Sequence, residues 1–245
     1  MELTSFNNPI DALVVGANGG LGHSFVKSLC EDYGVRTVHA WSRHALDITH
    51  DKVVSRTLDV GDETQLESAV REIDRLTLII VAIGILHDEN GLYPEKSYKS
   101  LDPSHMIEIF RVNAILPALI AKYTLPLLPR NERALYCALS ARVGSISDNR
   151  IGGWYSYRAG KAALNQIIKC LSIELRRTHK QAVCIGLHPG TVDTGLSRPF
   201  QKSLAPTHNL FMPGQAAANL LNVINHASCT QSGSVFAWDC SVIPA

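Results

Sequence analysis

Short apolar runs alternate with longer helix-like stretches along the whole chain, and this alternation is the main structural signal of the sequence. The apolar runs have the length and composition of buried strands, and the stretches between them have the spacing of helices. The predicted strands are 12–15, 37–41, 53–58, 78–82, 134–139, 182–187 and 235–238. Three predicted helices cover 63–73, about 103–128 and about 154–177. Two more begin near residue 21 and after residue 213.

Strands that are apolar along their whole length need cover on both faces of their sheet, and strand–helix alternation favours parallel pairing. We therefore expect an α/β fold with a doubly wound, mostly parallel sheet of about seven strands flanked by helices. The chain has 245 residues, of which 46% are apolar. This suffices for one full core, so residues 1–245 are expected to form a single domain.

One long connection, residues 195–212, has no clear strand pattern and contains Pro199 and Pro206. A segment of this kind directly after a strand end is typical of a mobile loop over a binding cleft. A simple surface excursion is the alternative. We interpret the segment as a substrate-loop insertion.

Charge, hydropathy and cysteine spacing exclude several classes of function. The 23 basic and 22 acidic residues leave a net charge of +1, which offers no footprint for nucleic acid or an anionic membrane. The most apolar segment, 76–86, spans 11 residues, and the N-terminus lacks the basic start of a signal peptide. The six cysteines show no C-x-x-C spacing and the ten histidines no H-x-x-x-H. We expect a cytoplasmic protein with reduced cysteines, no metal and a small-molecule partner.

A glycine-rich turn follows the first predicted strand and opens the first predicted helix. Missing Cβ atoms permit a tight turn and let a phosphate approach backbone N–H groups at the positive end of a helix. An ordinary glycine turn is the alternative, and the position within a strand–helix–strand unit favours dinucleotide binding. The turn residues assigned to the cofactor are Gly16, Asn18, Gly19, Gly20, Leu21 and Gly22.

The second predicted strand ends at Ser42 and Arg43, where many NAD-binding folds place an acidic residue for the ribose hydroxyls. A guanidinium at this point can pair with a 2′-phosphate, so NADP(H) is favoured over NAD(H). An exposed arginine after a strand is also common on protein surfaces, which is the alternative.

Tyr157 and Lys161 lie four residues apart in a predicted helix and therefore share one face. An ammonium beside a phenol favours the ionised phenol by Coulomb attraction, which makes the tyrosine a usable proton donor and acceptor. Such a pair is usually solvated surface unless other motifs accompany it.

Those other motifs are present. The G-x-x-x-G-x-G spacing, Tyr157-x-x-x-Lys161, Asn113 and the segment from Pro189 to Thr194 recur in an order that resembles the short-chain dehydrogenase/reductase family. The resemblance implies a Rossmann-type NAD(P)-binding domain in which the tyrosine exchanges a proton with the substrate oxygen and the lysine binds the nicotinamide ribose. The further cofactor residues that it implies are Asp59, Val60, Ala82, Gly84, Pro189, Gly190, Val192 and Thr194.

The family also uses a serine that polarises the carbonyl. Ser140 ends the fifth predicted strand 17 residues before Tyr157, whereas Ser145 precedes it by 12, nearer to the usual spacing. The surrounding sequence resembles the C-factor and sniffer-type carbonyl reductases, which carry a longer loop here and use the strand-end serine. We choose Ser140, with Ser145 as the alternative. In the family's pattern of paired serines, Ala141 would stand at the place of the second serine.

Asn113 has a backbone consequence of its own, because Pro117 lies four residues later and has no N–H to donate to its carbonyl. The resemblance implies that a water at this asparagine links the lysine to solvent. A mere proline kink is the alternative. Gly160, where the family usually has serine, weakens the helix, and close approach of the cofactor or of a helix is the simplest explanation.

These observations favour an NADP(H)-dependent oxidoreductase that reduces a ketone or aldehyde, or oxidises the alcohol, with Asn113, Ser140, Tyr157 and Lys161 as catalytic residues. The alternative is a C-factor-like signalling or regulatory protein that binds NAD(P) with little or no turnover. The resemblance implies a homodimer, a homotetramer or a monomer, since all three occur among such proteins.

Overall fold

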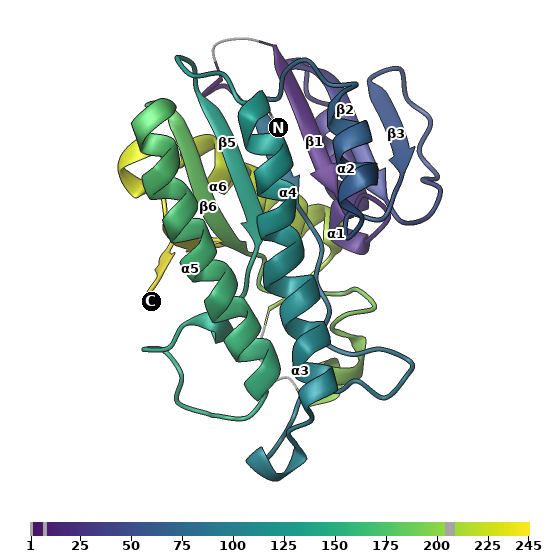
Figure 1. The fold of residues 1–245 in the computed structure, drawn as a ribbon, viewed down its shortest axis with the longest axis vertical. Coiled ribbons are helices and arrows are strands. Elements are labelled where there is room, and N and C mark those ends of the chain that lie inside the picture. The colour runs from purple at the N-terminus through teal and green to yellow at the C-terminus, as the bar shows by residue number, and fades with distance from the viewer. Residues whose placement is uncertain (1, 7–8, 204–208) are drawn as a thin grey trace.

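The predicted strands are present and belong to one sheet. The computed structural model describes residues 2–6, 9–203 and 209–245. In these residues the sheet strands are β1 (Ile10–Val15), β2 (Val35–Ser42), β3 (Val53–Thr57), β4 (Leu78–Val81), β5 (Ala134–Leu139), β6 (Ala182–His188), β9 (Val235–Ala237) and β10 (Val242–Ile243). Their order across the sheet is β10-β9-β6-β5-β4-β1-β2-β3 (Figure 1).

Among these strands every neighbouring pair is parallel except β9 and β10. The expectation of a doubly wound, mostly parallel sheet is confirmed, with one strand more than the seven expected. The additional strand, β10, has two residues. A segment so short shows no alternation of apolar and polar positions, so the sequence carried no signal for it.

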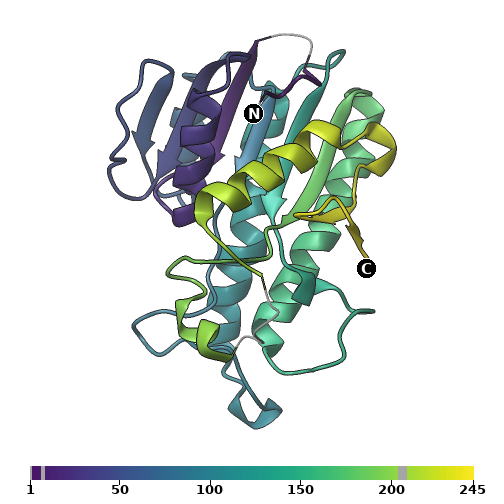
Figure 2. The same cartoon turned by 180° about the vertical axis from the view of Figure 1, so that it is seen from behind.

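Helices cover both faces of the sheet. Helices α1 (Gly20–Cys30) and α6 (Pro213–His226) lie on one face (Figure 2), and α2 (Glu63–Val70), α4 (Leu116–Thr124) and α5 (Tyr155–Thr178) lie on the other (Figure 1). Alternate side chains of β1 enter the two resulting cores: Ala12 and Val14 pack toward α1 and α6, and Leu13 packs on the opposite side. This two-sided burial explains why the strands read as continuous apolar runs.

The long helix predicted over 103–128 is interrupted at Asn113. It consists of α3 (Pro103–Phe110), a π-helical turn (Arg111–Ile115), α4 and a final 3₁₀ turn (Leu125–Leu127). In the π turn the Leu116 N–H donates to the Arg111 carbonyl five residues earlier. Since Pro117 cannot donate to Asn113, a widened turn is a physical solution to the missing bond. The kink expected at this proline is thus a π turn.

Gly160 allows α5 to approach α3 and the π turn closely. A Cβ atom at Gly160 would lie 3.1 Å from Ile109 Cγ2 and 3.7 Å from Asn113 Cβ. Of the two explanations expected from the sequence, a helix partner is therefore the one that the packing supports. The contact joins the helix of Tyr157 to the segment of Asn113.

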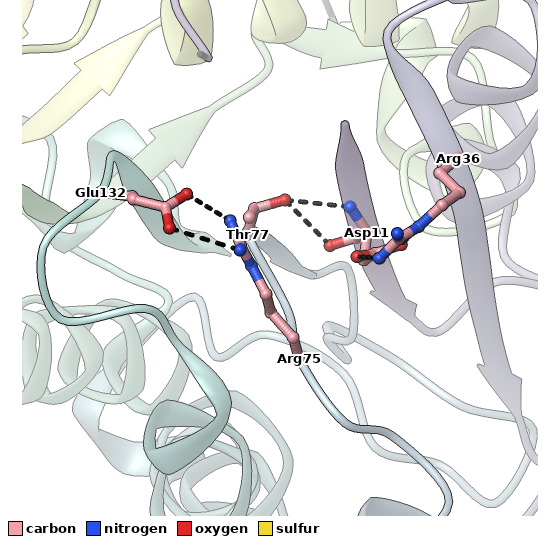
Figure 3. A network of polar contacts seen from close by, with 5 residues as sticks. All are labelled: Asp11, Arg36, Arg75, Thr77 and Glu132. Atoms are coloured by element: carbon pink, nitrogen blue, oxygen red, sulfur yellow. Dashed lines mark hydrogen bonds and ion pairs between the residues drawn. The ribbon is translucent and has the colours of Figure 1, made fainter. Parts of the chain in front are cut away.

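Polar contacts brace the edge of the sheet at the amino ends of the strands (Figure 3). The Asp11 carboxylate accepts from Arg36, with Nε at 2.9 Å, and the Thr77 hydroxyl accepts from the Asp11 N–H at 3.0 Å. Arg75 donates to Glu132 at 2.5 Å. These contacts tie β1, β2 and the segments before β4 and β5 together at the amino ends of the strands. The glycine-rich turn lies at the carboxyl ends, which are available for a site.

The segment 195–212 contains more regular structure than expected. It includes a 3₁₀ turn (Arg198–Ser203) and β8 (Leu210–Phe211), which pairs in parallel with β7 (Thr191–Val192). The expectation of no strand was wrong here, because a two-residue strand has no sequence pattern. Residues 204–208 of the predicted loop, with Pro206, lie outside the described residues.

In the described residues, Pro103–Leu127 is long and apolar enough to span a bilayer, with a mean hydropathy of 1.3 in its most apolar window. The core helix of a folded domain has the same properties. Here 39% of that window is buried, and Ile109, Asn113 and Ile120 of the segment lie in the protein interior. All six cysteines are free: Cys30, Cys137 and Cys184 are buried, whereas Cys170, Cys229 and Cys240 are exposed.

Candidate active site

A cavity of about 550 Å³ lies at the carboxyl ends of β1, β2 and β4. The strand order reverses between β1 and β4, and ligands of open α/β sheets bind in the crevice at such a point. Nine of the residues assigned to the cofactor from the sequence line this cavity: Gly16, Asn18, Gly19, Ser42, Arg43, Asp59, Val60, Ala82 and Gly84.

The glycine-rich turn forms a cradle that only glycine can build. Gly16 has a φ of +86°, and a Cβ there would lie 2.8 Å from the Ala82 carbonyl oxygen. A Cβ at Gly22 would lie 2.0 Å from the Gly16 carbonyl oxygen. The N-cap of α1, Gly19, supplies no side-chain cap, so the positive end of α1 faces the turn through backbone N–H groups. This arrangement fits the pyrophosphate of a dinucleotide.

Two of the remaining assigned cofactor residues, Thr194 and Val192, pack against the turn. A Cβ at Gly20 would lie 2.7 Å from Thr194 Cγ2, so Thr194 abuts the turn directly. Val192 packs with Leu21, and Gly190, with a φ of +76°, packs against Phe211. None of the residues Gly20, Leu21, Gly22, Pro189, Gly190, Val192 and Thr194 is among the described residues that line the cavity.

At the end of β2, Ser42 is buried and donates its hydroxyl proton to the His44 carbonyl at 2.6 Å, whereas Arg43 is exposed at the edge of the cavity. A second arginine, Arg111, also lines the cavity and makes a two-bond ion pair with Glu108 at 2.7 and 2.8 Å. Sequence reasoning missed Arg111, because the π turn that places it has no local sequence signal beyond Pro117.

Tyr157, Lys161 and Asn113 are all buried, with 8%, 3% and 0% exposure. Lys161 Nζ donates to the Leu139 carbonyl at 2.8 Å and lies 5.8 Å from the centre of the Tyr157 ring. A Cβ at Gly84 would lie 3.1 Å from Asn113 Oδ1 and 3.6 Å from Lys161 Nζ. The structure therefore brings Asn113 and Lys161 together behind Gly84, with Tyr157 one helical turn away. Gly84 lines the cavity, whereas Asn113, Tyr157 and Lys161 are not among the described residues that line it.

The Asn113 side chain joins two segments and uses both of its N–H donors to do so. Its Oδ1 accepts from the Ile85 N–H at 3.2 Å, and its Nδ2 donates to the carbonyls of Ile85 and Ile109 at 2.8 and 3.1 Å. These bonds attach the loop after β4 to the end of α3. A water relay at this residue can use the backbone carbonyl that Pro117 leaves without its helical donor.

The two candidate serines have different partners. Ser140 donates to Asn165 Oδ1 at 2.6 Å, and the Ser145 hydroxyl accepts from the Asp148 N–H at 3.1 Å. The residue after Ser140, Ala141, packs into the apolar cluster that contains Tyr157. While its bond to Asn165 lasts, Ser140 has no proton left for a substrate oxygen.

Burial changes the proton affinity of both residues of the pair. It raises the pKa of the Tyr157 phenol and lowers the pKa of the Lys161 ammonium from 10.5 to about 7, because a buried position disfavours each charged form. From the sequence alone, attraction to the ammonium was expected to lower the phenol pKa. Burial is the larger influence here, and Lys161 directs its ammonium to the Leu139 carbonyl.

The lowered pKa of Lys161 predicts a pH-dependent stability. Between about pH 7 and 10 the unfolded chain keeps a proton on Lys161 that the folded chain has lost, so the free energy of unfolding rises with pH. Relative to Lys161→Met, we expect the wild type to gain up to about 1 kcal/mol per pH unit over this range. Urea unfolding at several pH values measures this, and a constant difference between the two proteins would refute it.

Five rings from three segments meet at Tyr157, and we call them the aromatic cluster: His87, Tyr93, Trp154, Tyr157 and Phe200. Trp154 lies edge-on to Tyr157 at 6.2 Å between ring centres and 5.2 Å from Phe200. His87 contacts Tyr93 and Phe200 at 5.6 and 5.7 Å, and its Nε2 lies 3.1 Å from the Gly195 carbonyl oxygen. Of these rings the motifs in the sequence had indicated Tyr157, and the rings of the other segments are brought to it by folding of the chain.

Comparison with known proteins agrees with this geometry. A sequence model of the short chain dehydrogenase family matches residues 11–205. A 1-hydroxy-2-glutathionyl-2-methyl-3-butene dehydrogenase of Rhodococcus sp. (strain AD45) is 31% identical, over 90% of this chain and 93% of its own. C-signal of Myxococcus xanthus is 30% identical over 59% of this chain and 81% of its own.

Two solved structures share the fold. The carbonyl reductase Sniffer of D. melanogaster has a TM-score of 0.83 at 22% identity, covering 96% of this chain and 99% of its own. An NADPH-bound carbonyl reductase from chicken fatty liver has a TM-score of 0.83 at 24% identity, covering 98% of this chain and 96% of its own. The resemblance to C-factor and sniffer-type proteins expected from the motifs is confirmed.

Proposed function

The chain belongs to the short chain dehydrogenase family of oxidoreductases, and from this premise we propose that it is an NADP(H)-dependent carbonyl reductase. It would reduce a ketone or aldehyde, or oxidise the corresponding alcohol. The observation that carries the proposal is that Lys161 and Asn113 converge, one turn from Tyr157, directly behind Gly84, which lines the cavity at the carboxyl ends of β1, β2 and β4.

The glycine-rich turn and the N-terminus of α1 would hold the pyrophosphate, Asp59 and Val60 the adenine side, and Ala82 and Gly84 the nicotinamide side. When bound, NADPH would supply a hydride to the carbonyl carbon. The chicken carbonyl reductase has NADPH bound, which supports the choice of this cofactor.

Tyr157 would donate the proton to the substrate oxygen. Its raised pKa keeps the phenol protonated at neutral pH, as a proton donor requires. Lys161 is fixed between Leu139 and Gly84, where it would contact the ribose and restore the proton to Tyr157 from solvent through a water held by the Asn113 carbonyl. We keep Ser140 as the proposed hydroxyl for the carbonyl, a role in which it would exchange its bond to Asn165 for one to the substrate.

The surroundings of Tyr157 favour an uncharged substrate. Its apolar neighbours are Ile85, Leu86, Leu92, Ile109, Ala141, Val143, Trp154 and Phe200. A carboxylate brought into such walls without a partner would lose its hydration, whereas an aromatic ring would gain contacts with the aromatic cluster. We therefore propose neutral ketones or aldehydes with an apolar or aromatic group as substrates.

Measuring NADPH oxidation with a series of carbonyl compounds tests the proposed function. An aryl ketone should be turned over with a kcat/KM at least about tenfold above that of a keto acid of similar size. Carbonyl-independent NADPH loss alone, or none with any compound, would refute the function. The similarity to C-signal favours a second candidate, a signalling protein, for which saturable NADPH binding without oxidation is the expected result.

The cofactor preference rests on Arg43, which lies exposed at the cavity edge beside the end of β2. Arg43→Ala should raise the Kd for NADPH by about tenfold or more, because a charge-assisted bond to the 2′-phosphate is lost, and should leave the Kd for NADH nearly unchanged. Fluorescence titration with both cofactors measures this. Arg71→Ala, at an exposed arginine of another surface, is the control, and equal losses for NADPH and NADH would contradict the assignment.

A further inference from the structure

The helix that carries Tyr157 begins without a capping side chain of its own. Its N-cap residue is Trp154, which makes no side-chain cap bond. The first N–H groups of a helix have no acceptor within the helix, so an acceptor from elsewhere is needed where the helix start is buried. Tyr157 is the third residue of α5, and whatever holds this first turn also holds the tyrosine.

The backbone before the helix is left-handed at three consecutive positions. Gly152, Gly153 and Trp154 have φ values of +68°, +65° and +52°. For a residue with a side chain this conformation costs roughly 1–2 kcal/mol and persists only where neighbouring contacts impose it. Trp154 is the residue that packs against both Tyr157 and Phe200 in the aromatic cluster.

One residue supplies both missing contacts. Glu95, in the segment between β4 and α3, is 6% exposed. Its carboxylate accepts from the Ser156 N–H at 3.2 Å and from the Ser156 hydroxyl, and its backbone carbonyl accepts from the Trp154 N–H at 2.5 Å. A negative charge at the amino end of a helix is also favoured by the helix dipole.

We propose that Glu95 is a positioning residue for the reaction: it caps the first turn of α5 across 61 residues of chain and thereby fixes the hydroxyl of Tyr157 and the ring of Trp154 relative to the cavity. This inference rests on the proposed function. Glu95 contacts the residue before Tyr157 and the residue two before that, so a loss of its bonds shifts the proton donor while the glycine-rich turn of the cofactor site stays in place. The effect belongs in kcat, with cofactor affinity unchanged.

Substitutions of Glu95 can distinguish whether the length of its side chain, which lets it bond to Ser156, or its negative charge is what matters. Glu95→Gln can still accept from the Ser156 N–H and donate to the Ser156 hydroxyl, whereas Glu95→Asp keeps the charge but is one methylene too short to reach both. Glu95→Ala loses both bonds. Glu89→Gln, at an exposed glutamate of the same loop, is the control.

The test measures three quantities for each variant: kcat with an aryl ketone, the Kd for NADPH, and the rate of amide hydrogen exchange in residues 154–158. Glu95→Ala and Glu95→Asp should lower kcat by at least about tenfold, since small misplacements of a catalytic group have effects of this size. In both variants the amide hydrogens of residues 154–158 should exchange faster, while the Kd for NADPH is unchanged. The kcat of Glu95→Gln should stay within about threefold of the wild-type value.

Wild-type kcat and exchange in Glu95→Ala would overturn the inference, and so would Glu95→Asp outperforming Glu95→Gln, which would assign the effect to charge. If Glu95→Ala does not fold, the order of the Gln and Asp variants decides. Should the wild type reduce no carbonyl compound, the proposed function fails separately, and unchanged exchange at 154–158 in Glu95→Asp would then refute the cap itself.

Discussion

Tyr157→Phe should reduce kcat for carbonyl reduction by about 10²- to 10⁴-fold, the usual contribution of a general acid. The substitution removes one oxygen from a buried ring and leaves the packing against Trp154 in place. The variant should therefore fold as the wild type does and bind NADPH with the same affinity. Its effect isolates the proton donor from every other element of the site.

Steady-state kinetics with an aryl ketone, together with NADPH titration and thermal unfolding, measure this result. Tyr155→Phe is the matched control, because it removes the same atom from a partly exposed ring two residues earlier and should keep full turnover. Turnover in Tyr157→Phe near that of the control would show that another group donates the proton.

Gly22→Ala should weaken NADPH binding by about ten- to a hundredfold, the equivalent of the 1–3 kcal/mol that overpacking commonly costs. Its Cβ would lie 2.0 Å from the Gly16 carbonyl oxygen, 2.7 Å from the Gly16 carbonyl carbon and 3.1 Å from Ala17 Cα. All three are backbone atoms, which cannot rotate away as a side chain can. The turn must open, and the backbone N–H groups that would hold the pyrophosphate move with it.

Fluorescence titration with NADPH measures the affinity. Gly214→Ala is the control: it also places alanine in the first turn of a helix, and among the described residues outside that turn no heavy atom lies within 4 Å of the new Cβ. The control should bind NADPH like the wild type. An unchanged affinity in Gly22→Ala would mean that the turn relaxes without cost or does not hold the cofactor.

Features that depend on residues close together in the chain could be predicted from the sequence, whereas features that depend on distant residues could not. The π turn at Asn113 shows both cases. Pro117 predicted an interruption of the helix, because its missing N–H acts four residues away, but the type of turn depends on the side chains that pack against it. The packing of Ile109 against Gly160 joins residues far apart in the chain, so the sequence could not distinguish it from close approach of the cofactor. Similarly, the strands β8 and β10 have two residues each and exist through their partners.

By itself the sequence determined the doubly wound sheet, the glycine-rich turn after β1 and the shared helical face of Tyr157 and Lys161. Each depends on geometry within a few residues: the periods of strand and helix, the absence of a Cβ, the spacing of one helical turn. Only the tertiary structure decided that burial governs the pKa of this pair, that Ser140 donates to Asn165, that five rings gather at Tyr157 and that Glu95 caps α5. Those features depend on desolvation and on contacts between distant segments, which no local pattern encodes.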